Sequence, residues 1–550
     1  MTERDSLLGG APPPYPSVDP SHNPEHSSAS SPPPVKDNTL PPAQQCPQME
    51  FNTAWAGWKD RGFAIAFWIH FILVTILGFV LGVPAVRADA RERFDDPTRT
   101  ALDYNANLFI RVFVGAAAIS GAVAFVAFFV LQRCAGRIIK CSLYMGVAIQ
   151  ILLCITLFIV AWPMGIITLI FVLISLWYIY YVRNRIAFAE AHLQVGCAAL
   201  RSHPSVLFVA LAMLILQFLW IILWSLMALG LEYLANGNGN GNDQKSTGVG
   251  GGIFAIVLLT SLFWGALKST GVGGGIFAIV LLTSLFWGAL VFRNVTHFVT
   301  ACVVGQWWFT ADAHRRYAVE TSVQRAFTTN FGTISFGSLI IAFIKALRVF
   351  AQIHEGNARR DGNIVLLLIS CCAVCILRVF EGLLRYLNEW ALVFSALTGQ
   401  SFRSASRSFI DLFRQRGWTM IINDDLAGNA LTIVTVAIGC VSAAVGGVST
   451  YVTMPHSPSR AAIAGMAALF CFTIGIAMGT IMASILSSGV RTAFVCFAMN
   501  PTALGATHPE HLQNLLLAWY QFHPEAFAAS GFATQYPKPA GAPSNVYAAV

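Results

Sequence analysis

Charged residues are scarce in this chain. Of its 550 residues, 34 are Lys or Arg and 26 are Asp or Glu, together 11% of the chain, whereas soluble domains have about 25%. Hydrophobic residues make up 56% and the mean hydropathy is +0.64. These values exclude a soluble enzyme, a disordered protein and a nucleic-acid binder, despite the net charge of +8. They predict a polytopic membrane protein in contact with the lipid bilayer.

Motifs of soluble enzymes and pumps are missing as well. The chain has no phosphate-binding loop of the Gly-Lys-Ser/Thr type, which argues against an ATP-driven pump. Cys371, Cys372 and Cys375 form a cluster, but no second Cys pair or nearby His at zinc spacing accompanies them. We favour helix packing for these thiols, with a metal or redox role as the alternative. We expect a protein that is not an enzyme and that has no cofactor or bound metal.

The first 50 residues differ from the rest, because they contain 12 of the 24 prolines. Such a segment has too little apolar surface to form a core, so residues 1–55 are predicted to be a disordered tail. No apolar run follows the first residues, so we expect no signal peptide and a cytosolic tail. Within this tail, Glu3, Leu7 and Leu8 fit an acidic dileucine sorting signal.

A second motif in the tail suggests a protein partner. Pro12, Pro13 and Tyr15 fit the Pro-Pro-x-Tyr ligand of WW domains, which bind a preformed polyproline helix. The partner would be a WW-domain ubiquitin ligase. A proline-rich segment also produces such short matches by chance, and this alternative stays open.

Apolar runs of about 20 residues, the length of a membrane-spanning helix, follow the tail. Strands of a β-barrel would be about half as long and would alternate in polarity. The predicted fold is therefore all-α, with about ten transmembrane helices in residues 56–500 and a cytosolic C-terminal tail in residues 501–550. Nine of the runs are Gly62–Val83, Val112–Leu131, Cys141–Ala161, Met164–Val182, Val206–Leu231, Thr333–Phe350, Ile364–Leu384, Leu426–Val448 and Ala462–Leu486.

The tenth run lies in a tandem repeat. Residues Lys245–Leu267 recur without change as Lys268–Leu290. An identical copy indicates a recent duplication or an assembly error rather than the diverged repeats of transporters. Only the second copy continues directly into Val291, so we take it as the original and count one copy. If both copies span, the number of transmembrane helices is eleven.

The distribution of basic residues tests the orientation of these spans. With the N-terminus in the cytosol, the inner loops hold 13 basic residues and the outer loops 11. Downstream of the repeat the bias is clearer, with 7 inside and 4 outside; the outer group includes Arg348. This bias favours cytosolic placement of both termini.

Ionisable residues within membrane runs are costly and are therefore candidate functional residues. His70 lies in the first run, and Arg293 and His297 follow the repeat. Arg378, Glu381 and Arg385 lie at the end of the eighth, at spacings of three and four that place them on one helical face. Glu381 either belongs to an internal ion pair or faces a solute path and binds a cation or proton.

Residues 287–309 combine aromatic and polar side chains within an otherwise apolar run. Asn294 and His297 are three residues apart, and Trp307 and Trp308 end the segment. Aromatic faces attract quaternary ammonium groups, at about 0.5–2 kcal/mol per contact. A tryptophan near the end of a span is also a common interfacial anchor, and both interpretations stay open.

Several motifs in the second half of the chain together resemble the choline transporter-like family, and the similarity covers roughly residues 55–520. Trp58-Lys59-Asp60 is similar to the fungal branch, the pH-nine-sensitive proteins. Three positions depart from the family pattern: Glu389, Gln400 and Asn500. The motifs are Trp287-Gly288-x(4)-Arg293-Asn294-Val295-x-His297, Gly305-Gln306-Trp307-Trp308-Phe309, Tyr386-Leu387-Asn388-Glu389-Trp390-Ala391, Ser401-Phe402-x-Ser404-Ala405 and Ser488-Gly489-Val490-Arg491-Thr492.

The resemblance implies a plasma-membrane solute transporter that works without ATP on small organic cations such as choline or ethanolamine. Two alternatives remain: a non-transporting scaffold that recruits a ubiquitin ligase, and a membrane-embedded lipid-modifying enzyme. The candidate substrate-binding residues are Trp287, Asn294, His297, Trp307, Trp308, Glu381 and Asn388.

Overall fold

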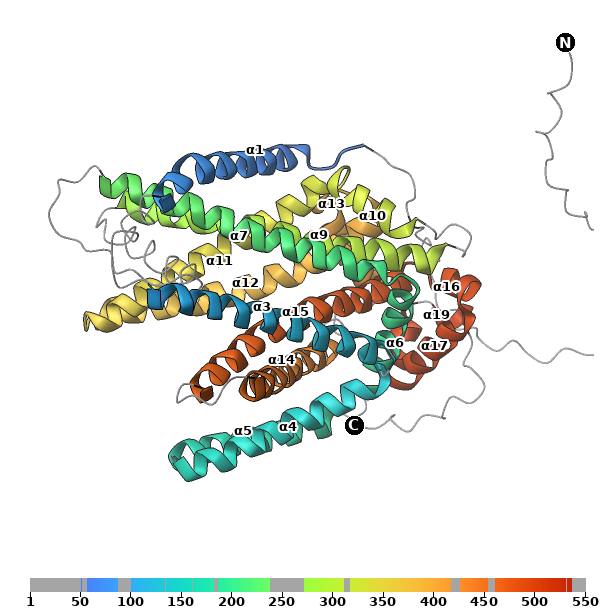
Figure 1. The fold of residues 1–550 in the computed structure, drawn as a ribbon. Coiled ribbons are helices and arrows are strands. Elements are labelled where there is room, and N and C mark those ends of the chain that lie inside the picture. Colours follow the sequence, from blue (N-terminus) through green and yellow to red (C-terminus); the bar gives the residue numbers. More distant parts are fainter. Residues whose placement is uncertain are drawn as a thin grey trace, which may run out of the picture. The chain divides into compact units, whose positions relative to one another are not determined.

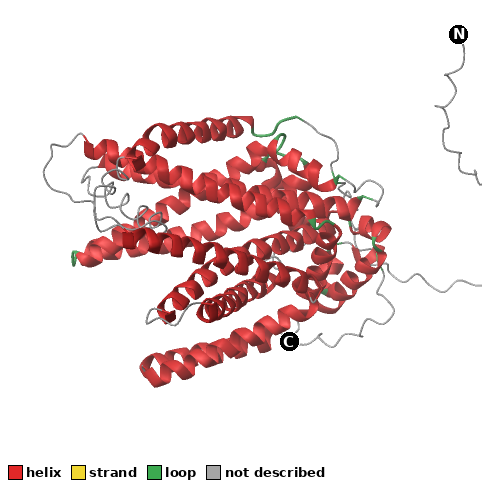
Figure 2. Cartoon of the chain, in the orientation of Figure 1, coloured by secondary structure: helices red, strands yellow, loops and turns green. Residues whose placement is uncertain are grey.

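The computed structural model describes residues 51, 57–87, 100–133, 135–160, 162–182, 186–237, 272–310, 317–416, 426–453, 460–530 and 532–536. Within these ranges the regular secondary structure is helical, without strands (Figure 2). Ten of the described helices are long and apolar enough to cross a membrane. The predicted all-α fold is therefore confirmed, and the described residues contain the ten predicted spans. Whether the first copy of the repeat adds an eleventh stays open, because it lies outside these residues.

The ten long helices match the predicted apolar runs to within one residue where they end earlier, and most extend beyond them. The run Thr333–Phe350, for example, lies within a helix that continues to Arg360. Once the apolar part of a helix is packed, polar residues that follow it can continue the helix. The long helices are α1 (Arg61–Leu77) with η1 (Gly78–Gly82), α3 (Thr100–Arg133), α4 (Ala135–Val160), α5 (Trp162–Val182), α7 (Ser205–Gly237), α9 (Val272–Phe309), α11 (Phe331–Arg360), α12 (Ile364–Thr398), α14 (Leu426–Thr453) and α15 (Arg460–Met499).

Shorter helices gather at one end of the long ones, at the right of Figure 1. The helix α17 packs against α6, and α16 against α9, so residues of the expected C-terminal tail fold onto the helices of the membrane domain. The short helices are α6 (Ile186–Ser202), α10 (Ala318–Phe327), α13 (Phe402–Gln415), α16 (Pro501–Thr507), α17 (Pro509–Phe522), α18 (Pro524–Ala529) and α19 (Phe532–Gln535).

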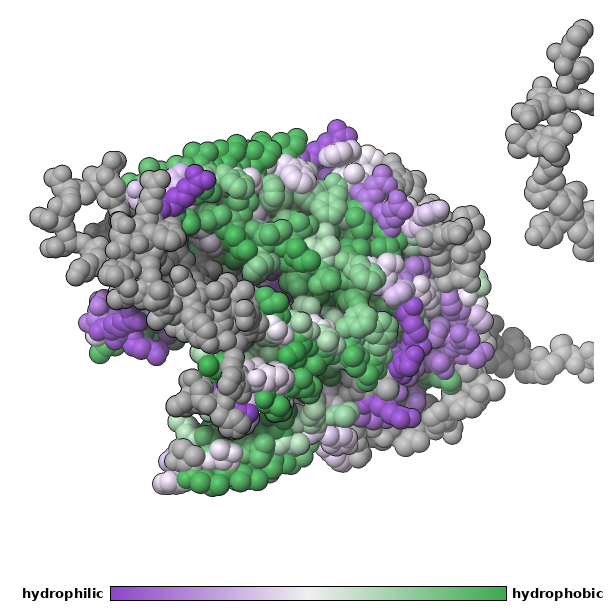
Figure 3. All heavy atoms as spheres, in the orientation of Figure 1, coloured by the Kyte–Doolittle hydropathy of each residue, from purple (hydrophilic) through white to green (hydrophobic). Residues whose placement is uncertain are grey.

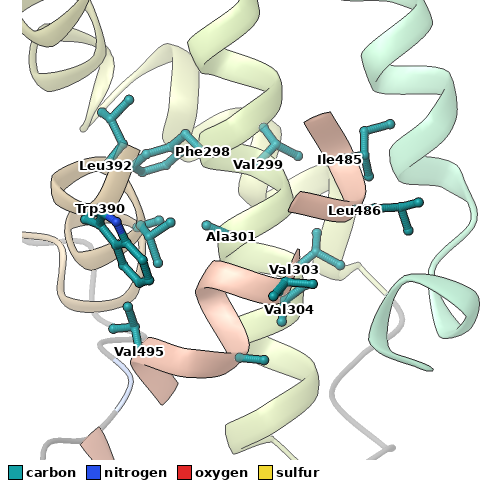
Figure 4. Close-up of a cluster of buried hydrophobic side chains, with 14 of the residues drawn as sticks. Phe298, Val299, Ala301, Val303, Val304, Trp390, Leu392, Ile485, Leu486 and Val495 are labelled. Carbon is teal, nitrogen blue, oxygen red and sulfur yellow. The ribbon is translucent and has the colours of Figure 1, made fainter. Parts of the chain in front are cut away.

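The helix α9 occupies the centre of the described helices. It contacts α7, α11, α12 and α15, and its apolar residues are spread over all of its faces, as expected of a helix buried among others. Figure 4 shows Phe298 and Val299 of α9 with Leu392 of α12 and Ile485 of α15, all of them buried. This packing fixes the positions of α9, α12 and α15 relative to one another.

Small residues allow two other helices to approach closely. A Cβ atom on Gly230 of α7 would lie 2.5 Å from the Cβ atom of Leu81, and one on Gly82 would lie 2.3 Å from the carbonyl oxygen of Leu226. Such glycine contacts are common between membrane helices, where close backbone approach replaces the hydrophobic driving force available in water.

The outer surface of the long helices is largely apolar. Figure 3 shows hydrophobic residues along the helices, and hydrophilic residues at the end that carries the short helices. Exposed side chains such as Ile159, Val379 and Phe208 are suited to contact lipid rather than water. The second copy of the repeat forms the first half of α9. The first copy lies outside the described residues.

Candidate functional site

Three central helices, α9, α11 and α12, enclose a polar cavity of about 140 Å³. It lies about halfway along each helix, at the depth where transporters typically bind their solutes. The residues that line it are Leu290, Arg293 and Asn294 from α9, Ile341 and Lys345 from α11, and Glu381, Arg385, Asn388 and Glu389 from α12.

The sequence brings these side chains together through helical periodicity. Glu381, Arg385 and Asn388 follow at intervals of four and three along α12, so they lie on one face of that helix. Ile341 and Lys345 are four residues apart on α11 and share a face in the same way. The packing of α11 against α12 turns both faces toward the cavity.

Glu381 is held by two guanidinium groups. Its side chain is only 3% exposed; Oε2 lies 2.5 Å from Nε of Arg348, and Oε1 forms an ion pair with Arg385. The Arg348 contact is close but is not an aligned hydrogen bond. A buried carboxylate needs such partners, because its desolvation costs several kcal/mol. Glu381 thus forms internal ion pairs and also faces a cavity, and binding of a cation or proton there stays a prediction.

Glu389 joins three helices. Its carboxylate lies 2.8 Å from Nη1 of Arg491 on α15 and 3.4 Å from Nη2 of Arg293 on α9. The Nε2–H group of His297 donates a hydrogen bond of 3.1 Å to the backbone carbonyl of Glu389, and Ser488 donates one to the carbonyl of His297. These contacts fix α9, α12 and α15 relative to one another beside the cavity.

The two asparagines at the cavity differ in their hydrogen bonding. The Nδ2 group of Asn294 donates a hydrogen bond of 2.8 Å to Oγ of Ser338. The Asn388 side chain is buried, and among the described residues neither its Nδ2 nor its Oδ1 has a hydrogen-bond partner. A Cβ atom on Gly337 would lie 2.1 Å from Oδ1, so only glycine leaves room for this amide. Buried polar groups are normally paired, so the free amide is suited to bind a solute.

The three tryptophans of α9 that are predicted to bind the solute do not line the cavity. Trp287 donates a hydrogen bond of 3.0 Å to the carbonyl of Ser335 and stacks on His70. Trp307 and Trp308 lie about 20 Å along α9 from Asn294, at 1.5 Å per residue. Trp308 donates to the carbonyl of Asn500, and Trp307 stacks on His508.

The cavity therefore brings together three of the predicted residues. Asn294, Glu381 and Asn388 line it, whereas Trp287, His297, Trp307 and Trp308 do not. His297 contributes through its hydrogen bond to Glu389. The motif residues Pro12, Pro13, Tyr15, Glu3, Leu7 and Leu8 lie outside the described residues.

Four charged residues of the site were not among the candidates: Lys345, Arg348, Glu389 and Arg491. The orientation count assigns Arg348 to the outer side, but the structure places it within α11 beside Glu381. Lys345 and Arg348 lie within a predicted membrane run, so the rule that identified Glu381 also identifies them. Glu389 and Arg491 become recognisable only through their contact in the folded chain.

Comparisons with known proteins point to one family. Residues 166–502, more than half of the chain, match the family model described as plasma-membrane choline transporter. Protein PNS1 of Gibberella zeae is 30% identical over 218 residues, 40% of each chain. Protein PNS1 of Candida albicans is 27% identical over 364 residues, 64% of this chain and 65% of that one.

A more distant organism supplies a further relative. A CTL-like protein of Dictyostelium discoideum is 26% identical over 386 residues, 69% of this chain and 61% of the relative. The match spans less than two thirds of the length of each of these three relatives.

Proposed function

This chain belongs to the plasma-membrane choline transporter family, and on that premise we propose that it is an ATP-independent carrier of a small organic amine of the choline or ethanolamine class. Membership of the family makes it a membrane transporter in general terms. The class of solute and the independence from ATP are the proposal. The lack of a phosphate-binding loop in the sequence supports the latter.

The central cavity is the observation that carries this proposal. It is polar, although it lies between the middles of three apolar helices, and such polarity is costly unless it serves binding. Glu381 and Glu389 provide the carboxylates that an ammonium group can approach, and Asn388 provides a free hydrogen-bond donor and acceptor. Rocking of helices around such a fixed site would expose it to each side in turn.

We further propose a plasma-membrane location with both termini in the cytosol. The description of the family supports the location. The short helices gathered at one end carry many basic residues, including Arg403, Arg407 and Arg414 of α13. Basic residues are enriched on the cytosolic side of membrane proteins, so this end faces the cytosol in the proposed orientation.

Uptake into proteoliposomes tests the transport function. Purified protein should take up labelled choline or ethanolamine without ATP, and Glu381→Gln should reduce the initial rate about tenfold or more. The matched control is Glu355→Gln, because Glu355 forms an exposed ion pair near the end of α11. Equal uptake by the Glu381 variant and the wild type, at equal reconstitution, would exclude a role for this carboxylate. Absence of uptake of both amines and of a zwitterionic amine such as N,N,N-trimethylglycine would favour the scaffold or lipid-modifying alternatives.

A WW-domain ubiquitin ligase is the proposed partner of the tail. The Pro-Pro-x-Tyr motif that ends at Tyr15 supports it. The variant Tyr15→Ala should lower ubiquitination and slow removal from the plasma membrane, whereas Tyr104→Ala outside the motif should not. Identical turnover of wild type and Tyr15→Ala would show that the motif is a chance match.

A further inference from the structure

The charges around the central cavity do not balance. Five basic side chains face two acidic ones, which leaves a formal charge of +3. Two of the basic groups, Arg293 and Arg385, are about half exposed and therefore lie only partly at the cavity. If both are left out, three basic groups still face two carboxylates. The basic residues are Arg293, Lys345, Arg348, Arg385 and Arg491, and the acidic residues are Glu381 and Glu389.

Among the five basic groups at the cavity, Lys345 is the one that forms no ion pair with a carboxylate of the described residues. Each of the two carboxylates already contacts two guanidinium groups. In the described part of the chain, no carboxylate lies within 4.0 Å of the Lys345 ammonium group, which instead lies 4.5 Å from the centre of the Phe286 ring. An ammonium group among membrane helices is costly without a counter-charge, and a ring face replaces one only in part.

The amide of Asn388 is an independent sign of a missing ligand. It lines the same cavity, is 3% exposed, and has no hydrogen-bond partner in the described residues. Its Nδ2 group carries two hydrogens that can be donated to an oxygen of a ligand. A surplus ammonium group and a free amide donor in one cavity are the two groups that a carboxylate or phosphate needs.

We propose that the cavity binds an anionic group, a carboxylate or a phosphate, through Lys345 and Asn388. The inference rests on the proposed function, because it concerns the same cavity. A bare organic cation entering this cavity meets a net positive charge. The amine must therefore enter together with an inorganic anion, or it must carry its own acidic group as a zwitterion.

Binding of anions to the purified protein tests the site directly. Calorimetric titration with sodium phosphate or sodium acetate, in a buffer of large sulfonate ions at constant ionic strength, should show saturable binding. Lys345→Met should weaken this binding about tenfold or more, since it removes a charge-assisted hydrogen bond. Lys345→Arg should retain it, because the charge is kept. Arg359→Met is the matched control, because Arg359 is an exposed cation on the same helix.

A second variant keeps the test valid if Lys345→Met does not fold. Asn388→Asp places a negative charge at the free amide and should also weaken phosphate and acetate binding about tenfold or more. Absence of saturable binding to the wild type, or equal binding by the wild type and a folded Lys345→Met or Asn388→Asp variant, would overturn the proposal.

Uptake measurements separate the two sources of the anionic group. If it is a free ion, phosphate or acetate should accelerate choline uptake into proteoliposomes several-fold over the sulfonate buffer. If it belongs to the solute, the zwitterion N,N,N-trimethylglycine should be taken up in the sulfonate buffer and choline should not. Anion binding without uptake of any amine would refute the proposed function alone. Choline uptake without anion binding would refute the present inference alone.

Discussion

Nη1 of Arg491 in α15 lies 2.8 Å from Oε2 of Glu389 in α12, and this ion pair connects two helices that are distant in the sequence. Because Arg293 of α9 reaches the other oxygen of the same carboxylate, one acidic side chain links three helices at the cavity. Relative movement of α9, α12 and α15 must therefore break at least one of these ion pairs.

Replacing the linking carboxylate tests this arrangement. Glu389→Gln leaves two arginines without their partner and should lower the free energy of unfolding by about 1–3 kcal/mol. This is less than the loss expected when a fully buried ion pair is broken, because Arg293 is half exposed. Thermal unfolding in detergent measures the change. Glu355→Gln breaks an exposed pair and should change stability by only about 0.5 kcal/mol or less. Equal midpoints for both variants would contradict the linking role.

The contact between Gly337 and Asn388 predicts a binding defect. A Cβ atom at Gly337 would lie 2.1 Å from Oδ1 of Asn388 and 2.8 Å from the Phe402 ring, so Gly337→Ala must displace the amide. We expect a loss of solute affinity of about tenfold, measured as an increase in the apparent KM of uptake. Gly356→Ala is the control on the same helix, because nothing lies within 4 Å of its added methyl group. Unchanged KM in both variants would show that the amide is not at the binding site.

Burial of a histidine outside the membrane spans predicts a pH effect on stability. His192 of α6 stacks on Phe494 at 3.7 Å, and desolvation lowers its pKa to about 3. Between pH about 6.5 and 3 the unfolded chain binds a proton at this residue and the folded chain does not. Folding stability should therefore fall with decreasing pH in this window, by up to about 1.4 kcal/mol per pH unit.

The variant His192→Phe isolates this contribution. It keeps an aromatic ring against Phe494 but cannot titrate, so its thermal midpoint should depend less on pH than that of the wild type below pH about 6. The comparison of the two pH profiles cancels the contributions of other groups. Parallel profiles would show that His192 is not the source of the acid sensitivity.

The membrane fold is predictable from the sequence because each span has its own apolar run. The run Ile364–Leu384 predicts α12, which the structure extends to Thr398. The apolar runs do not predict the helix α6. Its 17 residues include Glu190, His192 and Arg201, which make it too polar to stand out in a hydropathy profile. Its amphipathic face becomes meaningful only when α15 and α17 pack against it.

The site is only partly predictable from the sequence, for a different reason. Glu381 and Asn294 stand out as polar residues in apolar runs, but a helical pattern shows only which residues of one helix share a face. The pairing of Glu389 with Arg491 depends on how α12 packs against α15. The lack of a partner for Asn388 is likewise a property of the three-dimensional packing.

The carboxylate of Asp60 connects the start of α1 to two distant helices. Its Oδ2 atom accepts hydrogen bonds of 2.8 Å from Oγ1 of Thr333 and 2.9 Å from the backbone N–H of Phe402, at the start of α13. Asp60→Ala should cost about 1–3 kcal/mol, because it leaves both donors without their acceptor. Amide hydrogen exchange at Phe402 should become faster. Asp60→Asn keeps an oxygen at this place and should have a smaller effect. Unchanged exchange in the alanine variant would refute the connection.

The second copy of the repeat already occupies a place in the structure. Leu282, Leu285 and Trp287 are buried, and a Cβ atom on Gly288 would lie 2.1 Å from the Trp220 ring, so this segment fits closely against α7. The second copy therefore occupies that surface of α7. A helix of about 19 apolar residues is close to the length that spans a bilayer, so the effect of the extra copy on topology has to be tested.

Deletion of Lys245–Leu267 is that test. If the extra copy does not cross the membrane, the deletion leaves ten spans, the C-terminus stays in the cytosol, and expression is unchanged or improved. Every loop after the repeat then stays on the same side of the membrane, including the basic α13, which is cytosolic in the proposed orientation. A reporter fused after Val550 and assayed for protease or glycosylation access in intact cells gives the side directly. A reporter that changes sides upon deletion would show that the extra copy spans, and the full chain would then have eleven transmembrane helices.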